Sequence, residues 1–300
     1  MILREIVLTP TLQAVQVHIQ VLPTSLEASL AQNSDYFLRR IDGLDVDGMV
    51  YTNNNYIVSS TTGDMLETAL PVYTDRKLEL TLGYNPRETA PIEILRNKLY
   101  RLASTSKYSD LNVRFNGQHQ VNTSVGGVSY VTADCDVYGK ITRLDTDRFS
   151  LNPEITLTID CDRDSMFRSV YEQSVSIRDV TSLTFSDDFS TAWHGCHVEV
   201  KVTSTVNSGV LTPIQNFALS AAMVSSTVTN AFLPQDVIHI IHTPFLRSVY
   251  LKRGTATIPL GQALTSGVVW PVIYPGSNTW VRDSRVDWVS IKYNNAYWSI

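Results

Sequence analysis

Short segments in which apolar and polar residues alternate recur along most of this chain. The clearest are Val15–Val21, Lys77–Leu82, Leu111–Phe115, Ile155–Ile159 and Val198–Val202. In an extended strand this alternation brings the apolar side chains to one face, so each segment predicts a strand with one buried face. Sequences typical of tight turns separate the strands. They lie at Asn53–Asn55, Asn116–Gly117 and Gly126–Gly127. The pattern predicts a mainly β protein.

One segment has helical spacing instead of alternation. Its apolar residues recur at intervals of three or four and are Ile92, Leu95, Leu99 and Leu102. Pro91 suits the first turn of a helix, and Lys98 and Arg101 suit its end, so we expect one amphipathic helix at about 91–103. A weaker pattern at 22–34, diluted by Gln and Asn, is a second helical candidate.

The length of the chain, 300 residues, exceeds what one hydrophobic core usually organises, so two domains are expected. After Ile159 the run Asp160–Phe167 interrupts the alternation, and a new series of strands begins at about residue 173. The sequence therefore predicts a boundary near residue 170, with domains 1–170 and 171–300. An alternating strand, Val286–Tyr293, is expected to close the second domain.

Composition limits the classes of function. Residues 1–170 carry 16 Lys and Arg against 21 Asp and Glu, whereas residues 171–300 carry eight of each kind. An acidic first half disfavours DNA binding through phosphate contacts, which needs a basic face. The longest uncharged stretch, Val202–Gln235, is rich in Ser and Thr and contains two prolines, so it does not predict a membrane helix. No secretory signal is visible, and synthesis in a cytoplasm is expected.

Four features of the first half occur in a fixed order. They are Arg76–Leu80, the helix at 91–103, the hairpins across 111–143 and the segment Ile155–Phe167. This order resembles the N-terminal domain of the distal tail proteins (Dit-like phage tail family) of long-tailed bacteriophages. In that family a strand beginning with Arg leads to a helix and hairpins, and a closing strand ends in Cys-Asp before an aromatic residue. This chain has Asp164-Ser165 where the family commonly has Asp-Pro.

The second half is similar to the outer domain of the same proteins. The matching segments are Phe232–Ile241, Arg247–Leu251, Trp270–Asn278 and the terminal strands. The resemblance spans most of residues 75–300, and the first 75 residues are not diagnostic. It implies a tail-tube-like β-barrel or split sandwich with one helix in the first domain, and a galectin-like β-sandwich in the second.

The resemblance also implies a function. Members of this family are structural virion proteins without enzymatic activity or cofactor, and six copies form a ring in the distal tail. The ring, or hub, joins the major tail tube protein to the tail-tip, baseplate hub and tape-measure proteins. The first domains would form a tube and the galectin-like domains would face outward. An acidic first half would let genomic DNA pass through the lumen without specific binding.

Several polar clusters contain residue types found in metal sites, but their spacing favours structural roles. His194-Gly-Cys-His197 has the residue types of a metal site, but in a strand residues 194 and 197 point to opposite faces. The pair His239 and His242 has the same difficulty. Asp160–Asp164 begins like a calcium loop but lacks the Gly and Glu that the loop requires, so it is interpreted as a strand end at the joint between the two domains. Asp42, Asp45 and Asp47 are interpreted as a polar turn, with a cation bound between subunits as the alternative. The three cysteines, Cys135, Cys161 and Cys196, are expected to be reduced and buried.

All five tryptophans lie in the second half. They are Trp193, Trp270, Trp280, Trp288 and Trp298. Core packing and subunit contacts explain most tryptophans, but exposed rings would also suit sugar stacking or weak host glycan contact. A carbohydrate-binding or host-receptor-binding tail module is therefore the alternative hypothesis. A wall-degrading enzyme is a third, although no Gly-x-Ser-x-Gly elbow marks a nucleophile.

Overall fold

The computed structural model divides into two compact units, Met1–Val170 with Trp298–Ile300, and Tyr171–Tyr297. We call these the first and the second unit. The structure describes residues 2–11, 16–21, 34–45, 49–52, 72–86, 90–122, 128–147, 153–175, 182–225, 231–243, 246–297 and 300. Within these ranges no helix has the length and apolar character needed to cross a membrane.

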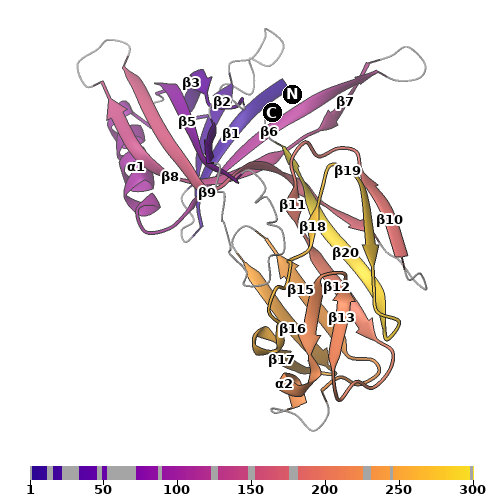
Figure 1. The fold of residues 1–300 in the computed structure, drawn as a ribbon. Coiled ribbons are helices and arrows are strands. Elements are labelled where there is room, and N and C mark those ends of the chain that lie inside the picture. Colours follow the sequence, from indigo (N-terminus) through magenta and orange to yellow (C-terminus); the bar gives the residue numbers. More distant parts are fainter. Residues whose placement is uncertain are drawn as a thin grey trace. The chain divides into compact units, whose positions relative to one another are not determined.

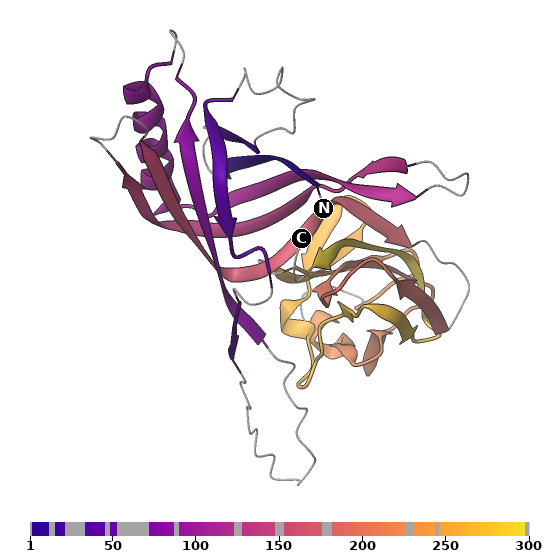
Figure 2. The same cartoon turned by 90° about the horizontal axis from the view of Figure 1, so that it is seen from above.

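The first unit is a closed, mixed β-barrel with two added strands (Figures 1 and 2). Its strands are β1 (Ile2–Pro10), β2 (Val17–Val21), β3 (Tyr36–Asp42), β4 (Met49–Thr52), β5 (Val72–Tyr84), β6 (Leu111–Asn122), β7 (Val128–Thr132), β8 (Cys135–Thr146) and β9 (Glu154–Val175). The circuit runs β1-β2-β3-β5-β9-β8-β6 and returns to β1; only the β2–β3 pair is parallel. Strand β4 extends from β5, and β7 extends from β6.

The barrel encloses an aliphatic core that the period-two pattern explains. Leu78, Leu80 and Leu82 of β5 are fully buried, and so are Leu157 and Ile159 of β9. Leu78 pairs with Ile159 and Leu80 with Leu157, so apolar side chains meet across neighbouring strands. The mainly β prediction and its alternating strands are confirmed in β2, β5, β6, β9 and β12 (His197–Val202).

The predicted helix is present as α1 (Ile92–Ser106) and contacts β8, β1 and β2 (Figure 1). It starts one residue later and ends three residues later than the expected 91–103. Pro91 is the N-cap, and beyond the last apolar contact Thr105 Oγ1 donates to the Arg101 carbonyl at 2.9 Å. Lys98 and Arg101 thus lie before the last turn of the helix, which ends at Ser106. The ammonium of Lys98 lies 2.8 Å from Asp35 Oδ2.

Two local predictions in the first unit are wrong. Asn116–Gly117 does not turn the chain: both residues lie inside β6, opposite a register shift between Leu3 and Glu5 of β1. A glycine within a strand here marks an irregular pairing, as at a β-bulge. The run Asp160–Phe167 does not interrupt the strand either, because β9 continues through it to Val175. Register shifts against β8 absorb the irregular alternation.

The second unit packs an antiparallel sheet and several smaller strand pairs around one core. The main sheet has the order β17-β16-β15-β12-β20, and the pairs are β10–β19, β11–β18 and β13–β14. Besides β12, the bounds are β10 (Ser182–Asp187), β11 (His194–Gly195), β13 (Val210–Ile214), β14 (Phe217–Ser220), α2 (Ala221–Ser225), β15 (Val237–His242), β16 (Arg247–Arg253), β17 (Ala256–Pro259), β18 (Val272–Ile273), β19 (Gly276–Val281) and β20 (Val286–Tyr297). A 3-10 turn, η3, spans Gly261–Ala263.

Side chains from all of these sheets share the core, as in a β-sandwich. Val198 and Val200 of β12 contribute from the main sheet, whereas Leu183 of β10 and Phe217 of β14 come from the small pairs. Several predictions lie outside the described residues. They are the helix at 22–34, the turns at 53–55 and 126–127, Asp47 and Trp298.

Candidate functional site

The barrel contains a buried arginine that links three distant segments. Arg76 of β5 is 1% exposed, and its guanidinium lies 4.4 Å above the ring of Phe167. Its Nη1 donates to the carbonyl of Gly43 at 2.5 Å and to that of Asp45 at 3.3 Å. Across the strand pair, Arg76 lies opposite Cys161. We call Arg76, Gly43, Cys161 and Phe167 the arginine junction.

Electrostatics and packing explain why the arginine junction has these residue types. Burial lowers the pKa of Arg76 to about 10, so the guanidinium stays charged at neutral pH. A buried cation is stabilised by carbonyl acceptors and by the electron-rich face of an aromatic ring. Gly43 has a φ of +91°, and a Cβ there would lie 2.0 Å from the carbonyl oxygen of Lys77. Only glycine therefore allows this close approach.

A polar groove of about 710 Å³ lies on the strands β2, β1, β6 and β8, on the face turned away from the buried side chains such as Ile6 and Leu8. Its side chains are paired: Glu5 accepts from Asn116 Nδ2 at 2.9 Å and contacts His18 Nδ1 at 2.7 Å. Arg114 holds Asp136 with two hydrogen bonds of 2.8 and 3.0 Å. This bidentate pair raises the pKa of Arg114 and fixes an ordered, mixed-charge surface.

Two residues of the segment His194-Gly-Cys-His197 pack inside the second unit. His194 is fully buried, and its Nε2 lies 2.8 Å from Asp187 Oδ2. Its ring also stacks on Tyr293, with the ring centroids 5.2 Å apart. Cys196 is buried 3.8 Å from the carbonyl of Pro271, and burial raises the pKa of its thiol. The sequence neighbours His194, Cys196 and His197 therefore do not converge on one point.

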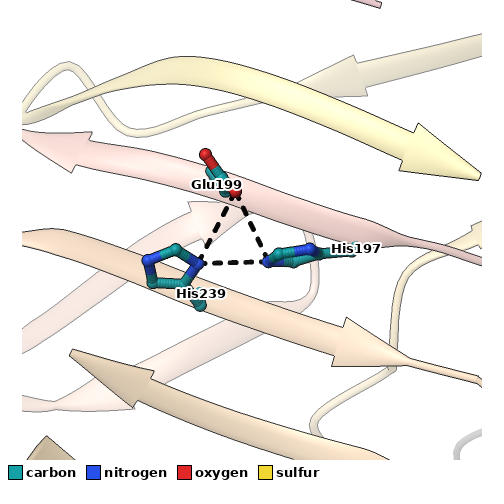
Figure 3. A group of neighbouring side chains, drawn as sticks. All are labelled: His197, Glu199 and His239. Atoms are coloured by element: carbon teal, nitrogen blue, oxygen red, sulfur yellow. Dashed lines mark hydrogen bonds and ion pairs between the residues drawn. The ribbon is translucent and has the colours of Figure 1, made fainter. Parts of the chain in front are cut away.

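The structure brings His197 together with two residues that the sequence did not connect to it. His197 and Glu199 lie on the same face of β12, and Glu199 pairs directly with His239 of β15 (Figure 3). His197 Nε2 is 3.1 Å from His239 Nδ1, and Glu199 Oε1 is 3.8 Å from each nitrogen. We call these residues the histidine cluster. Of the residues that the structure describes, no other group of three His, Cys, Asp or Glu side chains has this arrangement.

The surroundings of the histidine cluster favour neutral imidazoles. Burial lowers the pKa of both His197 and His239, and this effect outweighs the attraction of the Glu199 carboxylate. The ammonium of Lys292, on β20, lies 3.6 Å from Glu199 Oε1 and further opposes protonation of the rings. The ring of His239 stacks on Tyr250 at 4.7 Å between centroids, which fixes its orientation.

The tryptophans occupy different environments. Trp280 and Trp288 are 8% and 2% exposed and belong to the core, where Trp288 Nε1 donates to the Pro213 carbonyl at 3.3 Å. Trp270 is half-buried against Phe217 and His242. Trp193 is also half-buried. The rings of Trp280 and Trp288 pack the core and offer no free face to a sugar. A sugar-stacking role for the tryptophans stays a prediction.

The acidic runs do not form a cluster among the described side chains. Asp42 pairs with Arg40 at an exposed position, and the carbonyl of Asp45 accepts from Arg76. Asp160 lies within β9, opposite Lys77 and Lys140. All three cysteines are buried and free of disulfide bonds, and burial raises the pKa of Cys135 to about 12.

Comparisons with known proteins give structural similarity alone. No family model matches the chain, and no curated protein sequence matches it. The crystal structure of the Dit protein of phage SPP1, described as a paradigm of the hub adsorption apparatus in phages that infect Gram-positive bacteria, matches 87% of this chain and 93% of its own. Its TM-score is 0.48 at 12% identity.

Two structures of the phage p2 baseplate in its activated conformation also match. The one with Sr covers 96% of this chain and 97% of its own, with a TM-score of 0.38 and 10% identity. The one with Ca covers 98% of both chains, with a TM-score of 0.39 and 10% identity. The chain thus matches SPP1 Dit and p2 baseplate chains across nearly its whole length, at low sequence identity.

Proposed function

We propose that this protein is a non-enzymatic structural protein of the distal tail of a long-tailed bacteriophage. The observation that carries the proposal is the arginine junction. The two motifs on which the sequence resemblance of the first half rests, Arg76–Leu80 and the Cys-Asp segment before Phe167, are about 85 positions apart, yet Arg76 pairs with Cys161 and covers the ring of Phe167. The motifs are therefore parts of one structural feature, which makes a chance resemblance of separate segments a poorer explanation.

In this proposal six copies form a ring that joins the tail tube protein to the tail-tip and tape-measure proteins and leaves a lumen for DNA. A closed ring needs two different surfaces on each subunit, because its interfaces are heterologous. The first unit offers surfaces of different character. One is the polar groove, and others are the strands β4 and β7, each of which pairs with one neighbour within the described residues. An open strand edge can accept a strand from another subunit.

Labelling of intact particles tests the position in the virion. Antibodies raised against the purified protein and coupled to gold are expected to label one end of the tail, opposite the capsid, in particles of the phage that carries this protein. Antibodies against the capsid serve as the control for accessibility. Labelling along the whole tail, or on the capsid, would contradict the proposal, and so would particles that lack the protein altogether.

The alternative, a receptor-binding module, is tested with the half-buried rings. Trp193→Ala and Trp270→Ala are expected to reduce retention on host cells only if the second unit binds a surface glycan. Trp288→Ala is not suitable for this test, because its ring belongs to the core.

A further inference from the structure

We propose that the histidine cluster of the second unit is a binding site for a divalent transition metal ion of the zinc type. The inference is independent of the tail function. It rests on three atoms that converge from two neighbouring strands: His197 Nε2 and Glu199 Oε1 of β12, and His239 Nδ1 of β15 (Figure 3). Two imidazoles and a carboxylate are a ligand set that Zn²⁺ accepts, with a fourth position open to water.

The distances between the three atoms fit one ion. Ligands about 2.0–2.1 Å from a tetrahedral zinc ion lie about 3.4 Å from one another. The observed separations are 3.1 Å between the two nitrogens and 3.8 Å from Glu199 Oε1 to each nitrogen. A shift of a few tenths of an ångström, which is within the reach of rotamer adjustment, would make the three distances equal.

Neither imidazole forms a hydrogen bond with Glu199 Oε1, whose ion-pair partner is the ammonium of Lys292 at 3.6 Å. One imidazole nitrogen can donate to the other at 3.1 Å, but Glu199 Oε1 is 3.8 Å from each nitrogen, which is too long for a hydrogen bond. Three electron-pair donors therefore face one another with at most one proton among them. A cation between them would engage all three.

The backbone and the neighbouring side chains hold the ligands in place. Glu199 and His239 are directly paired across β12 and β15, so the sheet itself sets their separation. Stacking on Tyr250 orients the ring of His239, and burial keeps both imidazoles neutral, as metal ligation requires. The side chains of His239, Glu199 and His197 are 8%, 20% and 27% exposed, so an ion can enter from the side of His197.

The ligand types select the class of ion. Imidazole suits zinc, nickel and copper, whereas calcium and magnesium prefer sites made of oxygen atoms. Two positive charges oppose the ion. The ammonium of Lys292 lies 3.6 Å from Glu199 Oε1 and would compete with the metal for this carboxylate, and Lys252 also disfavours positive charge at both imidazoles. Removal of the Lys292 ammonium is therefore expected to strengthen metal binding, whereas loss of any ligand is expected to weaken it.

Calorimetric titration of the full chain, free of any histidine tag, with Zn²⁺ tests the site. One saturable site per chain is expected. His197→Ala and His239→Ala are expected to weaken it by at least about 100-fold, and Glu199→Gln by about 10- to 100-fold. Lys292→Gln is expected to tighten it by about 3- to 10-fold, because one ion pair is removed. Substitution with Co²⁺ is expected to give visible absorption bands that the His239→Ala variant lacks.

The matched control is His18→Ala. His18 also lies beside a glutamate, with 2.7 Å between His18 Nδ1 and Glu5 Oε1. The His18→Ala variant is expected to bind zinc as the unchanged protein does. Circular dichroism spectra confirm that each variant is folded before titration. The absence of saturable zinc binding would overturn the proposal. Zinc binding that survives loss of both His197 and His239, or binding of Ca²⁺ at this site in preference to Zn²⁺, would also overturn it.

Discussion

The two units of this chain enclose their cores with different arrangements of strands. The first closes seven strands into a circuit, and its core holds aliphatic residues such as Leu80 together with the rings of Phe115 and Phe167. The second packs separate sheets against one another and uses rings, including Trp288 and Phe217, in the shared core. Facing sheets lie about 10 Å apart and accommodate large side chains. The buried tryptophans among the described residues, Trp280 and Trp288, both lie in the second unit.

Buried polar groups differ in the same way. The first unit buries Arg76, whose charge does not change near neutral pH. The second unit buries three imidazoles, those of His194, His239 and His242. Imidazole is the side chain that titrates closest to neutral pH. Lowered imidazole pKa values occur at His197 and His239, both in the second unit, so the stability of this unit is expected to respond to mild acid.

The largest expected effect separates the two cores. Trp288→Ala is expected to lower the unfolding free energy of the second unit by about 3–5 kcal/mol, because it leaves a large cavity and an unpaired carbonyl at Pro213. Leu80→Ala is expected to lower that of the first unit by about 2–5 kcal/mol. Denaturant titration followed by hydrogen exchange of each unit measures both. Equal loss of protection in both units from either change would break the comparison.

The arginine junction gives the next effect. Arg76→Ala is expected to destabilise the first unit by about 2–3 kcal/mol, since the carbonyls of Gly43 and Asp45 lose a donor and the ring of Phe167 loses its cover. Arg76→Lys is expected to recover less than half of this loss, because an ammonium lacks the planar fork of guanidinium. Full recovery by lysine, measured by the denaturant midpoint, would mean that charge alone matters.

Mild acid sharpens the comparison of polar groups. The pKa values of His197 and His239 are lowered from 6.5 in the folded chain, so the unfolded chain takes up these protons first as the pH falls. Stability of the second unit is therefore expected to be complete above about pH 6.5 and to decrease below it, until the folded-state pKa values are passed. Melting curves at several pH values measure this effect. His239→Gln is expected to reduce it, and a variant with an unchanged pH profile would contradict this assignment.

The smallest effect concerns the polar groove. Arg114→Ala removes a pair whose side chains are 42% and 13% exposed, and a loss of about 0.5–1 kcal/mol is expected. If the groove is a contact surface between subunits, the same variant is expected to weaken assembly far more than folding. Light scattering measures the effect on assembly, and the denaturant midpoint measures the effect on folding. Arg143→Ala, at an exposed pair with Asp145, serves as the matched control.

Local patterns in the sequence predict strands and the helix well, because period and burial are linked directly. The four apolar positions of α1 and the alternation of Leu78, Leu80 and Leu82 are examples. The continuity of β9 could not be predicted in this way. Register shifts against β8 decide it, and these depend on a partner strand. The same holds for Asn116–Gly117, where pairing with β1 overrides a sequence that favours a turn.

The histidine cluster illustrates what spacing misses. His197 and Glu199 are two residues apart in an alternating strand, which places them on one face. The third residue, His239, comes from a strand 40 positions later and joins them only because β12 and β15 pair in this register. The usable signal in the sequence is the pair His197 and Glu199, and the string His194-Gly-Cys-His197 contains only one of these two residues.

Negative-stain electron microscopy of the purified full chain, together with its mass by light scattering, tests the central claim most directly. A hub subunit is expected to form closed rings with sixfold symmetry and a central opening, with a mass of six chains. Persistent monomers over a wide range of protein concentration, or open chains of subunits without closure, would contradict the proposed role as a tail hub.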